Sequence, residues 1–190
     1  IDSIIFQYHE RNTPPKQGIN TIYLASMNNF FNQLPDSLSK IVLNDAKSAK
    51  KRFKKSKDVQ ELADRIIYGN EKVEQALNYE DKAEEQLANR QTSLGIDNYL
   101  KSLEIRENNI NLIQILGLAY FNIQDYYNVI FYMDKLENMN IALDPLSLYV
   151  KGISLLQVNR KTEACDYLLR SKNFGREDAK KYYEGYCDLD

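Results

Sequence analysis

The sequence has no tryptophan, one histidine, two cysteines, four prolines and seven glycines among its 190 residues. So few helix-breaking residues favour long helices over a turn-rich β fold. No apolar run approaches the roughly 18 residues that a membrane-spanning helix needs, and no secretory signal pattern is present. His9 stands without a nucleophile motif or a glycine-rich phosphate loop, which predicts a surface side chain. We therefore expect an all-α protein that is not an enzyme and uses no metal, cofactor or small-molecule substrate.

Charge is spread unevenly along the chain. Hydrophobic residues make up 43% of the sequence and charged residues 27%, as is ordinary for a globular protein, and the net charge is −2. Residues 1–75 carry a net charge of +3 and residues 76–190 a net charge of −5. This asymmetry predicts two regions with different surfaces, a slightly basic N-terminal helical segment (1–75) and a second helical region (76–190).

The sequence alone does not determine the cellular compartment of the protein. Because the chain begins at Ile1 rather than at methionine, we expect that an upstream segment has been removed. A soluble, cytoplasmic protein is favoured, and a periplasmic or membrane-anchored protein is the alternative if that segment was a signal or an anchor. For Cys165 and Cys187 we favour two buried free thiols. A disulfide joining the last helix to the preceding one is the alternative, and it would need an oxidising compartment.

The first region shows helical spacing of its apolar residues. Residues 19–34 follow this spacing, and Pro35 ends the pattern because proline disfavours the helical conformation of the residue before it. Asp36 or Ser37 is expected to cap the next helix and Asp58 the one after it. A basic run follows in the same region.

Seven cations without an acidic residue lie between positions 46 and 57. A solvated helix end, complementing the helix dipole, is the favoured interpretation, with Ala46, Ala49 and Phe53 facing the core. The less favoured alternative function is a regulator whose basic helix 36–57 binds nucleic acid or an anionic membrane. The candidate anion-binding residues are Lys47, Lys50, Lys51, Arg52, Lys54 and Lys55.

The second region contains a repeated motif. The sequence Ile113-x-x-Leu116-Gly117-x-x-Tyr120 is followed by Gly152, 35 residues after Gly117 (152 − 117). A Leu-Gly-x-x-Tyr core that recurs at about 34 residues resembles the tetratricopeptide repeat. The resemblance covers roughly residues 76–188, with Ile113 replacing the usual tryptophan.

Further patterns extend this resemblance. A small-x-x-x-aromatic-x-x-small signature, typical of the second helix of a repeat, occurs at Gly95-x-x-x-Tyr99-x-x-Ser102, and a copy with leucine at the aromatic position occurs at Ala164-x-x-x-Leu168-x-x-Ser171. Small residues at these positions let two helices approach closely. Residues 144–145 form an Asp-Pro pair, which is expected to start a helix. Residues 177–187 are expected to form a terminal capping helix, so that the resemblance implies an α-α superhelix of helical hairpins.

The resemblance also implies a function. In tetratricopeptide arrays the first helix of each pair lines a concave groove that holds a peptide or an amphipathic helix. The register predicts a partner-binding groove made by Gln114, Leu118, Phe121, Asn122, Tyr149, Ile153 and Gln157. These positions hold no Lys or Arg, which excludes a clamp for a C-terminal carboxylate. We expect a non-catalytic adaptor or scaffold for an unidentified protein partner; filling of the groove by residues 19–34 of the same chain is the alternative.

Overall fold

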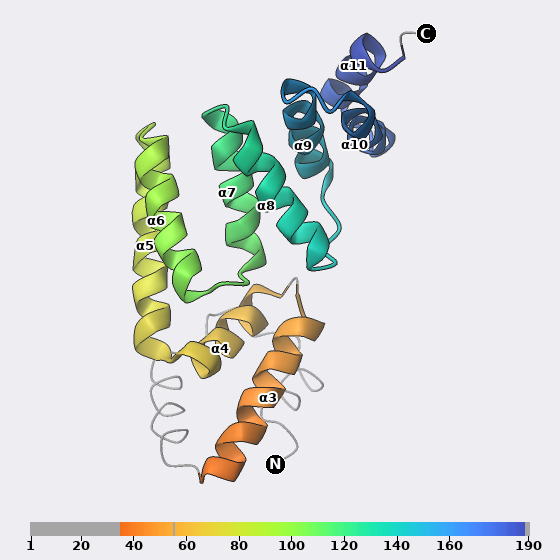
Figure 1. Cartoon of the computed structure of the whole chain (residues 1–190). Helices are drawn as coiled ribbons and strands as arrows, with labels where there is room; N and C mark the ends of the chain where they lie inside the picture. The colour runs from red at the N-terminus through yellow and green to blue at the C-terminus, as the bar shows by residue number, and fades with distance from the viewer. Residues whose placement is uncertain (1–34, 55, 189–190) are drawn as a thin grey trace. The chain divides into compact units, whose positions relative to one another are not determined.

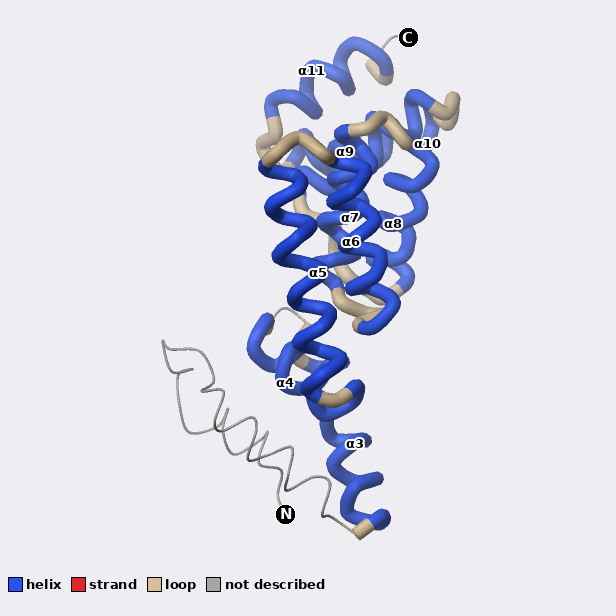
Figure 2. Tube along the Cα trace, turned by 90° about the vertical axis from the view of Figure 1, so that its left-hand side faces the viewer, coloured by secondary structure: helices blue, strands red, loops and turns tan. Residues whose placement is uncertain are grey.

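The computed structural model describes residues 35–54 and 56–188. All regular secondary structure in these residues is α-helical, with short connecting loops (Figure 2). This confirms the predicted all-α class. One compact unit runs to Asn78 and includes Glu104–Glu107, and the other holds Tyr79–Leu103 together with the chain from Asn108 onward. The sequence placed its boundary between residues 75 and 76. Within the described residues, no helix combines the length and the apolar character needed to cross a membrane.

The first unit contains α3 (Asp36–Arg52), α4 (Lys57–Tyr68) and the start of α5 (Asn70–Ala88). The predicted helix caps are wrong: α3 is preceded by Pro35 and α4 by Ser56, and neither residue makes a side-chain cap hydrogen bond. Asp36 and Asp58 instead lie inside the first turns, where their negative charge favours the helix dipole. The expected helix 19–34 and His9 lie outside the described residues.

A buried carboxylate organises this unit. Asp64 of α4 is fully buried and forms ion pairs with Lys50 of α3 and with Arg106, the latter at 2.9 Å. Gln60 donates to the backbone carbonyls of Lys50 and Phe53, at 2.7 and 3.0 Å, and so satisfies acceptors that the end of α3 leaves open. Because a buried charge is tolerated only with partners, Asp64 fixes α3 and residues 104–107 to α4.

The second unit is a series of helical hairpins. Besides the rest of α5 it contains α6 (Thr92–Ile105), α7 (Ile110–Asn122), α8 (Tyr126–Asn138), α9 (Pro145–Gln157), α10 (Lys161–Asn173) and α11 (Glu177–Tyr186). In Figure 1, α7 pairs with α8, α9 pairs with α10, and α11 packs on α10. The Ser102 hydroxyl of α6 donates to Glu80 of α5 at 2.6 Å, so these two helices also pair. The predicted series of hairpins with a terminal helix is confirmed.

The left-handed residues in the turns inside the hairpins recur at the period of the sequence repeat. Arg90, Gln124 and Asn159 each adopt a left-handed conformation, with φ of 61°, in the turn inside a hairpin. They are 34 and 35 residues apart (124 − 90 and 159 − 124). At each turn this residue and the one after it donate backbone hydrogen bonds to carbonyls of the preceding helix. This is the Schellman pattern that ends helices, repeated here at a constant interval.

Glycines permit close packing within the hairpins. A Cβ added at Gly117 would lie 2.5 Å from the terminal methyl carbon of Met133 on α8. At Gly152 it would lie 2.8 Å from Cγ of Leu168 on α10. A side chain at Gly152 would also crowd the Ala164 carbonyl oxygen at 3.3 Å, so this position needs glycine, whereas one at Gly117 would displace only the flexible end of Met133.

Polar side chains cap the N-termini of α7 and α9, the two helices that carry the candidate site. The side chain of Asn109 accepts a hydrogen bond from the backbone N–H of Leu112 at the start of α7. Asp144 does the same for Ser147 at the start of α9, at 2.8 Å. Pro145 occupies the first turn of α9, as predicted, where its missing N–H costs nothing.

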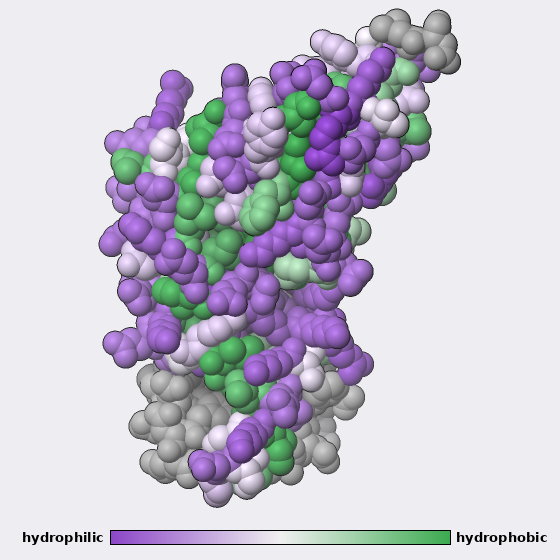
Figure 3. All heavy atoms as spheres, in the orientation of Figure 1, coloured by the Kyte–Doolittle hydropathy of each residue, from purple (hydrophilic) through white to green (hydrophobic). Residues whose placement is uncertain are grey.

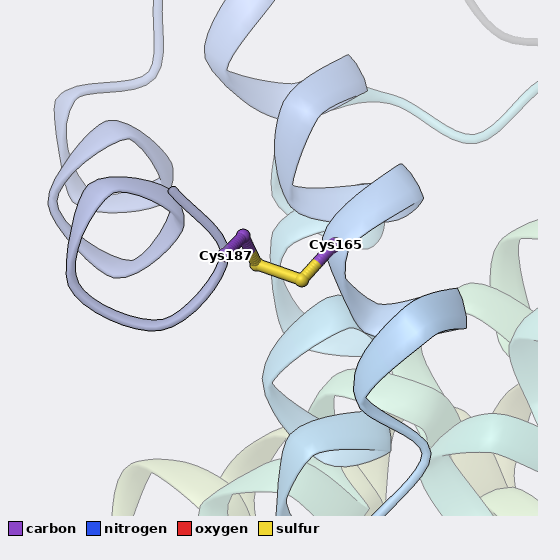
Figure 4. The surroundings of a disulfide bond; sticks show 2 residues. All are labelled: Cys165 and Cys187. Carbon is purple, nitrogen blue, oxygen red and sulfur yellow. A yellow bond between two sulfur atoms is a disulfide. The ribbon is translucent and has the colours of Figure 1, made fainter. Parts of the chain in front are cut away.

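The two cysteines form a disulfide, so the favoured expectation of free thiols was wrong (Figure 4). Cys165 lies in α10 and Cys187 follows the last residue of α11, with Cα atoms 5.6 Å apart. The bond therefore fixes the end of the terminal helix to α10. Sequence separation alone could not reveal this, because the distance depends on how α11 turns back along α10.

Candidate protein-binding surface

The predicted groove positions lie on α7 and α9, the first helices of two successive hairpins. Each helix is anchored by a fully buried side: Ile113 and Leu116 of α7, and Leu148 and Leu155 of α9. These side chains fill the cores between hairpins and fix the rotation of both helices. Six of the seven predicted positions are incompletely buried, and Ile153 is the exception.

Five of the predicted residues are accessible to different degrees. Asn122 and Gln157, the last residues of α7 and α9, are exposed. Leu118, Phe121 and Tyr149 are half-buried. Phe121 and Tyr149 pack against the same buried cluster, and the Phe121 ring meets the edge of Tyr126 with centroids 6.3 Å apart. We call these five residues the α7–α9 surface.

The other two predicted residues have internal roles. Ile153 is only 6% exposed and packs with Leu168 and Ala179, so its side chain is not available to a partner. The Gln114 amide donates to the carboxylate of Asp144 and to the Ser147 hydroxyl, the latter at 3.1 Å. It thereby joins α7 to the start of α9. The spacing in the sequence places both residues on the right helices but cannot show these partners.

Tyr149 links the surface to α11. Its ring meets the edge of Tyr182 with centroids 5.9 Å apart, and the Arg176 guanidinium lies 4.9 Å from its centroid. Burial raises the pKa of the Tyr149 hydroxyl, and Tyr182 and Asp178 raise it further. The hydroxyl is therefore neutral at ordinary pH. Tyr182 was not among the predicted groove residues; its spacing of four residues from Tyr186 was the signal for a shared, accessible side.

The α7–α9 surface carries no formal charge, because it consists of two amides, two aromatic rings and a leucine. On the side of the second unit drawn in Figure 3, apolar side chains gather over α7 where it lies beside α6, with polar side chains around them. Such a surface suits an uncharged guest better than an anionic or cationic one.

The basic run does not form one continuous cationic side. Lys50 pairs with the buried Asp64, and its ammonium lies 5.4 Å from the centroid of the Tyr68 ring, so it serves the core of the first unit. Lys47, Lys51 and Arg52 are exposed, whereas Lys54 is half-buried. Lys55 lies outside the described residues. Ala46 and Ala49 are buried and Phe53 packs beside them, as predicted.

Among residues 35–54 and 56–188, no group of His, Cys, Asp and Glu side chains is arranged to hold a metal ion. Comparison with known proteins gives no relative: no family model, no curated protein and no solved structure matches the chain.

Proposed function

We propose that the chain is a non-catalytic adaptor or scaffold, built from tetratricopeptide-like hairpins, that binds a segment of a partner protein on the α7–α9 surface. The observation that supports this most is the combination at that surface of half-buried Leu118, Phe121 and Tyr149 with the exposed amides of Asn122 and Gln157. An apolar centre with polar groups around it is the usual composition of a protein-binding site.

The guest is a peptide or an amphipathic helix. Covering the remaining accessible area of Leu118, Phe121 and Tyr149 would add hydrophobic stabilisation at about 25 cal/mol per Å². Aromatic anchors of this kind often supply the largest single contributions to an interface, about 2 kcal/mol or more. The exposed amides would set the position of the guest through hydrogen bonds.

The disulfide supports an oxidising compartment over the cytoplasm that the sequence favoured. Disulfides persist in secreted, periplasmic and surface proteins and are rare in a reducing cytosol. Alkylation of the protein in its source cells, followed by mass spectrometry, tests this directly. Blocked, unreactive Cys165 and Cys187 are expected; two alkylated thiols would place the mature protein in a reducing compartment.

Matched charge substitutions test the binding surface. Asn122, Gln157, Asn138 and Asn173 are all exposed and are the last residues of α7, α9, α8 and α10. The variant Asn122→Lys/Gln157→Lys introduces two cations at the α7–α9 surface, and Asn138→Lys/Asn173→Lys introduces the same charge at equivalent helix ends. Exposed substitutions of this kind change stability by only about 0.5 kcal/mol.

The readout is capture of a partner from the native extract by each immobilised full-length chain, followed by affinity measurement with the purified partner. The first variant should lose at least about tenfold in affinity, because an uncharged guest must then desolvate two cations. The second should match the wild type. Equal capture by both variants would contradict the proposal. Capture that disappears with added salt and nuclease would instead support the basic helix 36–57 as the working element.

A further inference from the structure

We infer that the Cys165–Cys187 disulfide is a redox switch, which holds α11 over apolar residues of α9 and α10 and whose reduction uncovers them. The bond joins the end of α11 to α10 (Figure 4), while residues 174–176 join the start of α11 to the end of α10. The oxidised chain therefore attaches α11 to α10 at both ends. After reduction only the attachment at residues 174–176 remains, so α11 can move away without unfolding α10.

One row of residues makes the contact that the disulfide protects. Ala179 and Tyr183 of α11 and Cys187 directly after it follow each other at intervals of four residues. They pack against Ile153 of α9 and Leu168 of α10, which are 6% and 0% exposed. Because Cys187 belongs to the row itself, breaking the bond acts directly on the contact that covers these two side chains.

The ion pairs of α11 lie at the solvent-exposed side of this contact. Glu184 pairs with Lys172 at 3.6 Å, and Asp178 pairs with Arg176 at 3.2 Å. The side chains of the two acids are 47% and 58% exposed. Exposed ion pairs contribute little to stability, so these pairs do not hold α11 in place by themselves.

The helix is also weak on its own. It has ten residues, whereas an isolated helix needs roughly 12–15 to persist in water. Gly185 lies inside it and weakens it further, although a Cβ there would meet no atom within 4 Å. Within α11, all of which the structure describes, only Ala179 is fully buried. The attachment of this helix therefore depends mainly on the disulfide.

The reduction is an exchange with a dithiol. Cys165 and Cys187 are both half-buried, so a thiolate in solution can reach the bond. One thiolate of the dithiol attacks a sulfur atom of the disulfide, which forms a mixed disulfide and releases the other cysteine as a thiolate. The second thiolate of the dithiol then releases the remaining cysteine and closes a disulfide in the reductant. Two electrons pass to the cysteines, which take up the two protons that the dithiol loses. A protein dithiol of the thiol–disulfide oxidoreductase class is the reductant that we expect in a cell.

Release of α11 would change the α7–α9 surface. Ile153 follows Tyr149 by four residues on α9, and both pack in the cluster that α11 covers. The Tyr149 ring also meets Tyr182, with centroids 5.9 Å apart, and lies under the Arg176 guanidinium. Without α11, Ile153 becomes accessible beside Tyr149, where the repeat register placed it. This consequence rests on the proposed function: the redox state would decide whether a guest of the α7–α9 surface also contacts Ile153.

The experiment uses the full chain in three states: oxidised, reduced with dithiothreitol, and reoxidised with glutathione disulfide. Amide hydrogen exchange is followed by nuclear magnetic resonance. Reduction should speed exchange in α11 at least about tenfold, through openings that leave α7 closed, and reoxidation should restore the first rate. A soluble paramagnetic agent should broaden the Ile153 methyl signals more in the reduced state. The methyl groups of Ile113, which is 0% exposed in α7, are the control and should not respond.

Variants separate the switch from side effects of the reductant. Cys165→Ala/Cys187→Ala should behave like the reduced wild type and should not respond to dithiothreitol. Gly185→Ala should slow exchange in α11 of the reduced chain about fivefold, because alanine favours the helix by that factor and its Cβ has free space. The same variant should leave exchange in α7 unchanged. Both effects follow only if α11 opens as a separate unit.

Two results would overturn the inference. One is that reduction leaves exchange in α11 and broadening at Ile153 within about twofold of their oxidised values. The other is that α11 opens only together with α7, which would make the disulfide a support of the whole fold. None of these measurements needs a partner, so failure of the switch leaves the proposed function standing. Conversely, equal capture by Asn122→Lys/Gln157→Lys and its control variant would contradict the proposed function and leave the switch standing.

Discussion

The ammonium of Lys151 lies 2.5 Å from the carboxylate of Glu137, inside the contact between α9 and α8. Lys151 is only 3% exposed, and it also pairs with Asp134 and donates to the Tyr167 hydroxyl at 2.7 Å. Burial lowers the pKa of Lys151, and the hydrogen bonds that its ammonium donates to Asp134, Glu137 and Tyr167 raise it by more, so the net shift is upward. The contact between α8 and α9 therefore contains a buried, fully paired cation.

Removing the two acids should cost more stability than removing the lysine. The double variant Asp134→Asn/Glu137→Gln leaves a buried ammonium without a counter-charge, and we expect a loss of about 3 kcal/mol. In Lys151→Met the acids remain, but both are partly exposed, and Arg170 lies 3.8 Å from Glu137. Water and Arg170 can then stabilise them, so the loss should be about 1 kcal/mol. Urea denaturation measures both, and the reverse order would contradict this account of the pair.

Stability should fall in alkali between pH 10 and about 12. Burial, with help from Glu84 and Glu80, raises the pKa of Tyr99 to about 12, and burial with Tyr120 raises that of Tyr132 to about 12. Because the folded pKa exceeds the unfolded value of about 10, the stabilisation is complete below pH 10 and is lost as the pH rises through the folded pKa. Each group contributes on the order of 2 kcal/mol.

Tyrosine-to-phenylalanine variants isolate this effect from the other groups that titrate in the same range. The free energy of unfolding of Tyr99→Phe should fall less between pH 10 and 12 than that of the wild type, because the variant has one buried phenol fewer to ionise. Tyr127→Phe changes a strongly exposed phenol and should show the wild-type slope. Equal slopes for all three proteins would show that burial of Tyr99 does not govern the alkaline limit.

The disulfide should stabilise α11 locally and the fold globally. It closes a loop between residues 22 apart, for which chain entropy gives about 3 kcal/mol. In Cys165→Ala/Cys187→Ala, we expect that loss together with faster amide exchange in α11, which is too short to persist as a free helix. Amide exchange that occurs through local opening of α7 should change little. Unaltered exchange in α11 would mean that the packing of Ala179 alone holds the helix.

A substitution at Gln124 should stabilise the turn between α7 and α8. Gln124 has a left-handed φ of 61°, a conformation that costs most residues roughly 1–2 kcal/mol but not glycine. Gln124→Gly should therefore raise the unfolding free energy by about 0.5 kcal/mol, after the extra flexibility of glycine in the unfolded chain is subtracted. The matched change Asp97→Gly, at an exposed position inside α6, should lower it by about 1 kcal/mol. A loss in both variants would exclude strain at Gln124.

The sequence predicted the parts of the fold that depend on local spacing. The interval between Gly117 and Gly152, the Asp144–Pro145 helix start and the terminal helix follow from short patterns, and the structure contains each of them. A pattern on one helix, however, does not show the partner on another. Lys50 was grouped with solvated lysines because its partner Asp64 lies 14 residues away, on α4.

The candidate site was predictable only in outline for the same reason. The register of the tetratricopeptide-repeat resemblance predicted seven groove residues on α7 and α9. The structure shows Gln114 bonded to Asp144 and Ile153 buried beside α11. Pairing of Cys165 with Cys187 likewise depends on the path of α11, which no local pattern encodes. Tertiary contacts, rather than helix formation, decide which residues of an amphipathic helix stay accessible.

The most direct test of a binding surface on α7 and α9 is photo-crosslinking from a single defined position. A photoreactive phenylalanine derivative at position 122, the exposed end of α7, is compared with the same group at position 138, the exposed end of α8. After illumination in the native extract, position 122 should give a specific adduct with one partner protein, which excess unlabelled wild-type chain suppresses, and position 138 should not. Adducts of equal yield from both positions, or from position 138 alone, would contradict the assignment of the partner to the α7–α9 surface.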